Sequence, residues 1–175
     1  NNILEDWITI FAAELNINIE IVSGIWGPAF LHAASENHSE NRVVYFLNNS
    51  LRDLMPECNS HIVKYSAAEI TDTIESFVEK ATSRGNHVIA TYFEDVCIMP
   101  PASDIHQMSN AKINFLNQAM INLSSKHKNF RALSLSKLEH LTETKIFSGS
   151  RDWYLYGHCF SMAGSVLLAN RILLQ

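Results

Sequence analysis

The sequence contains few cysteines, and their positions argue against two common uses of that residue. Three cysteines occur in 175 residues, at Cys58, Cys97 and Cys159. An odd number without a close pair argues against a disulfide framework and against a zinc site, and it favours a reducing compartment. The eight histidines also include no pair with metal-ligand spacing. We therefore expect a cytoplasmic protein with no bound metal or other cofactor of its own.

The sequence also lacks the features that direct a protein to a membrane or to nucleic acid. No apolar run is long enough to span a bilayer, and no charged segment followed by an apolar stretch marks a signal peptide. The net charge of −5 argues against a broad nucleic-acid interface. No glycine-rich loop matches the P-loop or the dinucleotide fingerprint. With 47% hydrophobic and 18% charged residues, the chain is expected to form one globular domain over residues 1–175.

Stretches with a strand pattern alternate with stretches with a helix pattern. Apolar residues at helical spacing predict helices at 3–15, 67–83, 107–128 and 161–174. Alternating or continuous apolar runs predict strands at 17–22, 43–47, 87–92 and 130–134. This order predicts an α/β fold in which a parallel sheet is covered on both faces, a three-layer α/β/α arrangement of the flavodoxin-like kind. Because the chain opens on a helix, the first strand of such a fold is missing from this sequence, or the sheet is built without it.

Polar residues and glycines follow several of the predicted strands. Ligands of parallel sheets bind beyond the carboxyl ends of the strands. Those ends fall at residues 23–27, 48–50 and 92–95, and the loop 152–158 lies at the last crossover. We therefore expect these segments to converge on one cleft.

The loop before the last helix carries groups that are suited to acyl transfer. His158 is a candidate general base, and Asp152 is the candidate group that orients it. Three groups from the first half of the chain are candidates for binding an oxyanion: the backbone N–H of Gly27 and the side-chain amide of Asn49 or Asn48.

The sequence does not identify a nucleophile for such a reaction. Ser23, Ser50 and Ser161 lie near the predicted edge, but none has the context of a nucleophile elbow. Cys159 is adjacent to His158, although a buried cysteine is more often a small apolar filler. A structural role is equally compatible with this loop, in which its aromatic residues close the core and Asp152 caps a helix.

Three short blocks resemble the SGNH (GDSL-type) hydrolase superfamily. Residues 21–27 are similar to the block whose glycine donates to the oxyanion, which is Gly27 here. Residues 43–49 are similar to the block in which a strand leads to an asparagine donor, which is Asn49. His158, followed by Ser161 and Gly164, is similar to the block with the catalytic histidine. The block that would carry the serine is absent.

More narrowly, nearly the whole chain resembles the SGNH-like N-terminal domain of FkbH-like proteins. The residues that carry this resemblance are 43–47, 51–54, 116–117, 152–155, 160–161 and Gly164. In that family a haloacid-dehalogenase-type phosphatase domain follows, and the whole protein makes glyceryl-carrier-protein units for polyketide assembly. The resemblance implies an acyl carrier protein or an adjacent synthase domain as partner, and a phosphopantetheine arm on that carrier protein.

Three functions are therefore carried forward. The first is an auxiliary domain of an FkbH-type or assembly-line protein that helps to load or modify an acyl or glyceryl unit. The second is an SGNH-type serine esterase or acyltransferase whose nucleophile lies outside this chain. The third is an interaction module without a pocket.

Overall fold

The computed structural model describes residues 3–22, 43–49, 66–93, 103–146 and 160–174, and for residues 103–110 the backbone alone. These residues fall into two compact units, which are described separately. One unit comprises residues 24–133, and the other comprises residues 1–23 with 134–175.

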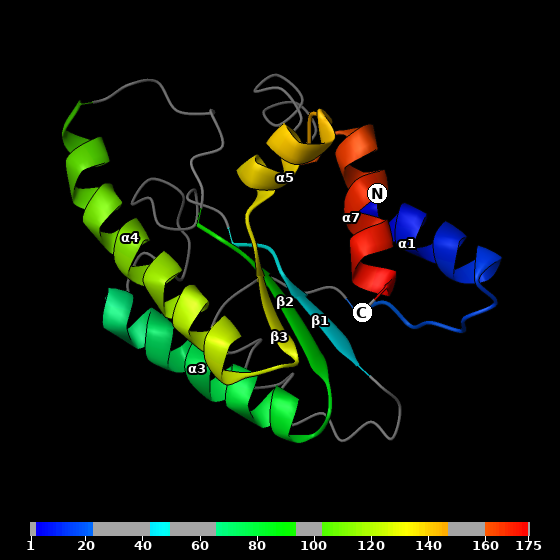
Figure 1. The fold of residues 1–175 in the computed structure, drawn as a ribbon, viewed down its shortest axis with the longest axis horizontal. Coiled ribbons are helices and arrows are strands. Elements are labelled where there is room, and N and C mark those ends of the chain that lie inside the picture. Colours follow the sequence, from blue (N-terminus) through cyan, green and yellow to red (C-terminus); the bar gives the residue numbers. More distant parts are fainter. Residues whose placement is uncertain (1–2, 23–42, 50–65, 94–102, 147–159, 175) are drawn as a thin grey trace. The chain divides into compact units, whose positions relative to one another are not determined.

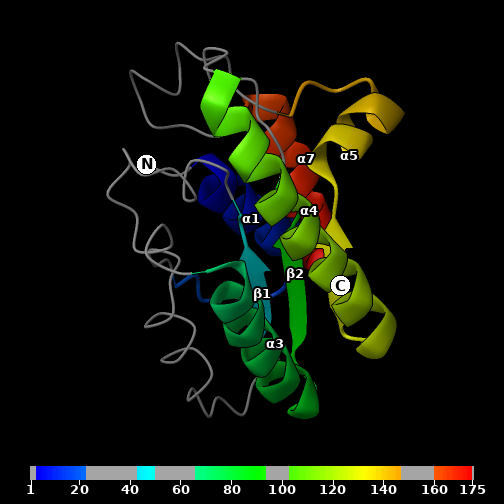
Figure 2. The same ribbon diagram turned by 90° about the vertical axis from the view of Figure 1, so that its left-hand side faces the viewer.

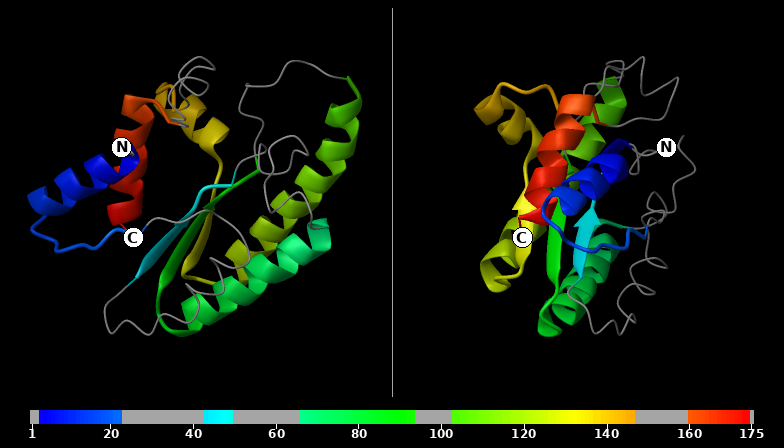
Figure 3. Two further views of the ribbon diagram at one scale, coloured as in Figure 1. Left: turned by 180° about the vertical axis from the view of Figure 1, so that it is seen from behind. Right: turned by 90° about the vertical axis from the view of Figure 1, so that its right-hand side faces the viewer.

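The unit of residues 24–133 is built on a parallel sheet with strand order β1-β2-β3. The strands are β1 (Val44–Leu47), β2 (His87–Thr91) and β3 (Phe130–Leu133). They appear side by side, in cyan, green and yellow, in the left view of Figure 3. The register places Leu47 opposite Ala90 and Thr91 opposite Leu133. The prediction of an α/β fold with a parallel sheet is therefore confirmed.

Two helices connect the strands and lie on the same face of this sheet. They are α3 (Ala67–Ser83), before β2, and α4 (Ser103–Lys126), before β3. Figure 1 shows both helices on one side of the strands, and Figure 2 looks onto that side. Placing both crossovers on one face is what right-handed connections between neighbouring parallel strands require.

The ends of α3 follow from its flanking residues. Ser66 and Glu69 form a capping box, in which each side chain accepts a hydrogen bond from the backbone N–H of the other residue. At the other end Gly85 adopts a φ of +81°, a left-handed conformation that glycine enters without strain. The chain then turns directly into β2.

The core of this unit lies between the two helices and the sheet. The predicted apolar face of α3 is buried in full, and Leu116, Met120 and Leu123 of α4 pack against it. Phe77 meets Tyr45 of β1 edge to face, with ring centroids 5.0 Å apart. The helical periodicity of both segments therefore identified the core correctly. The α3 residues of the core are Ile70, Ile74, Phe77, Val78 and Ala81.

The unit of residues 1–23 and 134–175 is helical in its described part. It contains α1 (Ile3–Glu14), α5 (Leu135–Thr142) and α7 (Met162–Leu173), and α1 packs against α7. The face predicted for α7 from helical spacing comprised Met162, Val166, Ala169 and Leu173, and of these Ala169 alone is buried. Met162 is 66% exposed, and the buried residues are Gly164, Ser165, Leu168, Ala169 and Ile172.

The predicted strand at residues 17–22 is wrong. This segment has no regular secondary structure, and Ile17, Ile21 and Val22 are exposed. Alternating β-branched residues fit a pleated surface, but a strand also needs a neighbouring backbone to pair with. No strand pairs with this segment in the part of the chain that the structure describes.

Candidate functional site

The structure describes two of the five predicted site residues. Asn48 and Asn49 directly follow β1, at the carboxyl edge of the sheet, where Asn48 is half-buried and Asn49 is 5% exposed. Gly27, Asp152 and His158 lie outside the described residues, as does Cys159. Their predicted convergence with Asn49 remains a prediction.

Side chains replace the backbone ladder where β1 and β2 end. In this register the next ladder bond would join the N–H of Asn49 to the carbonyl of Thr91. Instead, that N–H donates to Thr91 Oγ1 at 2.7 Å, and Asn49 Nδ2 donates to the Thr91 carbonyl. The Thr91 hydroxyl donates in turn to the Asn49 carbonyl at 3.3 Å. The two strands are therefore joined by side-chain bonds at this point, and Asn49 is held in a fixed orientation.

This arrangement leaves one buried acceptor without a partner. Asn49 Oδ1 is buried and has no hydrogen-bond partner among the described residues. The reverse amide orientation would set Oδ1 against the Thr91 carbonyl, two acceptors face to face, so the orientation is determined by the network. An unpaired buried acceptor costs about 1–3 kcal/mol, which a bound donor group would recover.

Asn117 of α4 holds the next residues of the same edge. Its Oδ1 accepts from the Phe93 N–H at 2.8 Å, and its Nδ2 donates to the Phe93 carbonyl at 3.0 Å. Phe93 is itself 1% exposed, so these backbone groups have no access to bulk water. Asn114 is exposed, whereas Asn117 caps the exit of β2.

Sequence reasoning missed Thr91 as part of the site. Thr91 is fully buried at the end of the apolar run of β2. A threonine is common in strands, so its type alone gave no signal. The usable signal was its position. Thr91 is a hydroxyl residue at the end of a buried strand, and the neighbouring strand β1 is followed directly by two asparagines.

Ser161 has a structural role within the helical unit. Its Oγ donates to the Lys145 carbonyl and accepts from the Gly164 N–H at 2.9 Å, which caps α7. Its N–H donates to the Ile146 carbonyl at 2.7 Å. The hydroxyl proton is therefore committed, and Ser161 is the N-cap of α7 and not an activated nucleophile.

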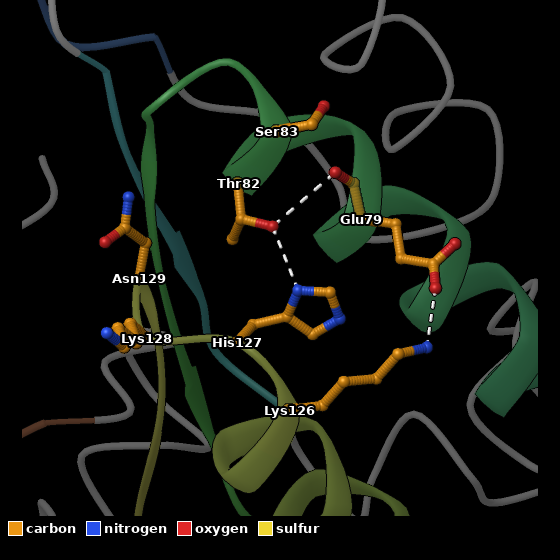
Figure 4. A pocket seen from close by; sticks show the side chains of 7 residues that line it. All are labelled: Glu79, Thr82, Ser83, Lys126, His127, Lys128 and Asn129. Carbon is orange, nitrogen blue, oxygen red and sulfur yellow. Dashed lines mark hydrogen bonds and ion pairs between the residues drawn. The ribbon is translucent and has the colours of Figure 1, made fainter.

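A second polar site lies at the opposite, amino end of the strands. It is an open depression of about 350 Å³ between the last turns of α3 and α4. Figure 4 shows the ring of His127, the residue that follows α4, pointing toward Thr82 of α3, with Lys126 reaching Glu79 beside it. Lys128 and Asn129 complete its rim.

Hydrogen bonding determines the tautomer of neutral His127. Thr82 Oγ1 lies 2.7 Å from the Val78 carbonyl, which can only accept, so the hydroxyl proton points there. The contact of 3.2 Å between Thr82 Oγ1 and His127 Nδ1 therefore runs from Nδ1–H to the hydroxyl oxygen. His127 Nε2 is then an acceptor, and it is buried without a partner among the described residues.

Ion pairs link the two helices next to this ring. Lys126 Nζ lies 2.7 Å from Glu79 Oε1 and 3.1 Å from Glu75 Oε1. The hydrogen bond from Lys126 is the largest cause that lowers the pKa of Glu79. The hydrogen bonds that Lys126 donates to Glu79 and Glu75 raise the pKa of Lys126. All three side chains are exposed by 41% or more, so water screens these pairs. The amino-edge site therefore has the chemistry of a helix-to-helix link.

The described residues were also compared with the requirements for a metal site and for a membrane-spanning helix. None of their histidine, cysteine, aspartate and glutamate side chains form a group of three that could hold a metal ion. No helix within the described ranges has the length and apolar character needed to cross a membrane.

No protein-family model and no curated protein matches the sequence. A likeness does appear at the level of structure. The N-terminal part of the protein BF1531 from Bacteroides fragilis, which contains a phosphatase domain and was crystallised in complex with Mg, is similar with a TM-score of 0.64 and 15% sequence identity. The alignment covers 97% of this chain and 47% of that chain, so this chain spans about half the length of the protein it matches. At this identity the likeness shows the fold.

This likeness corrects the family assignment made from the sequence. The similar protein is described as containing a phosphatase domain, not as an SGNH hydrolase. The blocks that carried the resemblance are only a few residues long, and such short matches do not discriminate between families of one fold class. The SGNH assignment is therefore wrong, and the serine-esterase alternative that depended on it falls with it.

Proposed function

We propose that this chain is the α/β part of an FkbH-type protein, and that the carboxyl edge of its sheet binds an acyl or glyceryl unit carried by an acyl carrier protein. The observation that carries this proposal is the Asn49–Thr91 network, in which a buried amide is fixed in place and keeps an acceptor unpaired. The likeness to a phosphatase-containing protein of about twice the aligned length supports an FkbH-type parent.

The chemistry of the edge favours binding over catalysis by this part of the chain. The side chains that form its hydrogen bonds are the amides of Asn49 and Asn117 and the hydroxyl of Thr91, and the half-buried amide of Asn48 precedes Asn49. The hydroxyl is engaged both as donor and as acceptor, and no imidazole or carboxylate contacts it among the described residues. Amides and engaged hydroxyls position a ligand, whereas nucleophilic catalysis needs a group with a base beside it. The edge therefore suits a domain that receives or presents a carrier-bound unit.

A titration of the isotope-labelled chain with an acyl carrier protein tests this proposal. The carrier protein is supplied without its arm, with the phosphopantetheine arm, and with a glyceryl unit on that arm. We expect the glyceryl form to shift the backbone signals of Asn49 and Thr91, because both N–H groups belong to the edge.

Two variants on the same chain serve as a matched pair. Asn49→Leu removes the edge amide and is expected to weaken binding, whereas Asn114→Leu removes an exposed amide of α4 and is expected to leave binding unchanged. If none of the three carrier forms shifts any signal, the assembly-line proposal is wrong.

A further inference from the structure

The orientation of the Asn49 amide indicates which kind of ligand group it can bind. Its Nδ2 is already committed to the Thr91 carbonyl, and its backbone N–H is committed to Thr91 Oγ1. The group that remains is Oδ1, which is buried and unpaired among the described residues. An asparagine placed to stabilise an oxyanion would present Nδ2 to the ligand, so this arrangement has the opposite polarity.

We infer that Asn49 acts as a hydrogen-bond acceptor that selects ligands with a donor group, such as a hydroxyl or an amide N–H. This inference rests on the proposed function and specifies the ligand at the same site. The amide cannot rotate to present Nδ2, because rotation would bring Oδ1 against the Thr91 carbonyl and leave the donor unpaired.

The surroundings of the amide make this selection effective. Asn49 is 5% exposed and Thr91 is fully buried, so bulk water does not offer Oδ1 an equal alternative. A ligand that leaves a buried acceptor unpaired loses more binding free energy than a ligand that lacks a contact at the exposed surface. A glyceryl unit brings two hydroxyl donors, whereas a plain propionyl unit brings none.

The hydrogen bonds of Asn117 contribute to the same selectivity. By bonding both backbone groups of Phe93, Asn117 fixes the chain two residues beyond Thr91 and so limits movement of the carbonyl that orients Asn49. Asn117 is thus a positioning residue, which acts through Thr91 and without a ligand contact of its own. Loss of the Asn117 side chain is expected to lower the ratio of affinities for ligands with and without donors. It is expected to change the affinity for the ligand without donors less.

The test compares two small probes on the full chain, the S-ethyl thioesters of glyceric acid and of propionic acid, which differ in hydroxyl donors and carry no amide N–H. Both are titrated under nuclear magnetic resonance. One neutral hydrogen bond to a buried acceptor predicts that the glyceryl probe binds roughly fivefold more tightly. Asn49→Leu is expected to bring the ratio close to one.

Each outcome separates this inference from the proposed function. Equal binding of both probes to the unaltered chain would show that another group, such as an ordered water, satisfies Oδ1; the inference would then fail while the proposed function stands. A preference that survives Asn49→Leu would also overturn it. If neither probe binds and no carrier form binds, both proposals fail. The comparison of probes on the unaltered chain does not depend on the folding of any variant.

Discussion

Replacing Gly164 by alanine would place a methyl group inside the backbone of Ile146. The added Cβ would lie 2.2 Å from the Ile146 carbonyl oxygen and 2.6 Å from its Cα, whereas ordinary contacts begin at 3.4 Å. The two segments would have to separate by about 1.2 Å, the difference between 3.4 and 2.2 Å. That separation acts on the bonds that join the start of α7 to residues 145–146: Ser161 N–H to the Ile146 carbonyl at 2.7 Å, and Ser161 Oγ to the Lys145 carbonyl.

The size of the effect follows from these contacts. Weakening two hydrogen bonds costs about 1 kcal/mol each, and forcing extra volume into a packed site costs about 1–3 kcal/mol. Alanine in place of a helical glycine returns about 1 kcal/mol. We therefore expect Gly164→Ala to lower the free energy of unfolding by about 2–4 kcal/mol.

Urea denaturation followed by circular dichroism measures this loss. Gly85→Ala is the matched control, because its Cβ would meet no atom within 4 Å and its cost is limited to the left-handed φ of +81°, about 1–2 kcal/mol. A Gly164→Ala protein as stable as the unaltered chain would refute the close approach between α7 and Ile146.

Three further predictions concern the unit of residues 24–133. Asn117→Ala should lower the free energy of unfolding by about 2–4 kcal/mol, because it leaves the buried N–H and carbonyl of Phe93 without hydrogen-bond partners. Asn114→Ala should change stability little in the same thermal melting experiment, and equal losses for the two variants would contradict the role given to Asn117. Ile74→Ala should cost about 2–5 kcal/mol in urea denaturation, since Ile74 is fully buried in the core, and a loss below 1 kcal/mol would argue against that packing. The pKa of Glu79 is lowered in the folded state mainly by its bond to Lys126, so the link adds stability above the ordinary glutamate pKa and loses it as the pH falls through the lowered value. Lys126→Met should flatten this part of the stability profile between about pH 5 and pH 3, and an unchanged profile would show that the link contributes nothing.

The sequence predicted the fold best where burial alone determines it. The helix at 67–83 and the strands at 43–47, 87–92 and 130–134 match the structure within about a residue. In each case apolar periodicity and flanking Ser66 or Gly85 point to the same answer. The strand prediction for residues 17–22 was wrong because an alternating pattern gives only a preference for extended structure. Whether a strand forms also depends on a neighbouring strand with which its backbone can pair.

The α7 face shows a second limit of sequence reasoning. Three of the four residues of the predicted face are large and apolar, Met162 among them, whereas the helix buries Gly164 and Ser165 together with larger residues. Gly164 and Ser165 are buried because the helix approaches Ile146 closely, and this approach depends on a missing side chain. A hydrophobic pattern weights large residues and so does not register such a contact.

The candidate site was partly predictable for a related reason. Asn49 could be placed at the carboxyl edge because a buried parallel strand precedes it. Its partner Thr91 and the positioning residue Asn117 lie 42 and 68 residues further along the chain, and their hydrogen bonds depend on the register of β1 against β2 and on the packing of α4. Pairings of this kind are tertiary, so no local pattern in the sequence contains them.

The most direct test of the account is to locate the carrier-bound unit on the protein. Intermolecular nuclear Overhauser effects would be measured between the protons of a glyceryl unit on an acyl carrier protein and the side chains of the labelled chain. The account predicts contacts to the Asn49 amide protons and the Thr91 methyl group at the carboxyl edge. Contacts confined to the opposite edge, around His127 and Lys128, would contradict it.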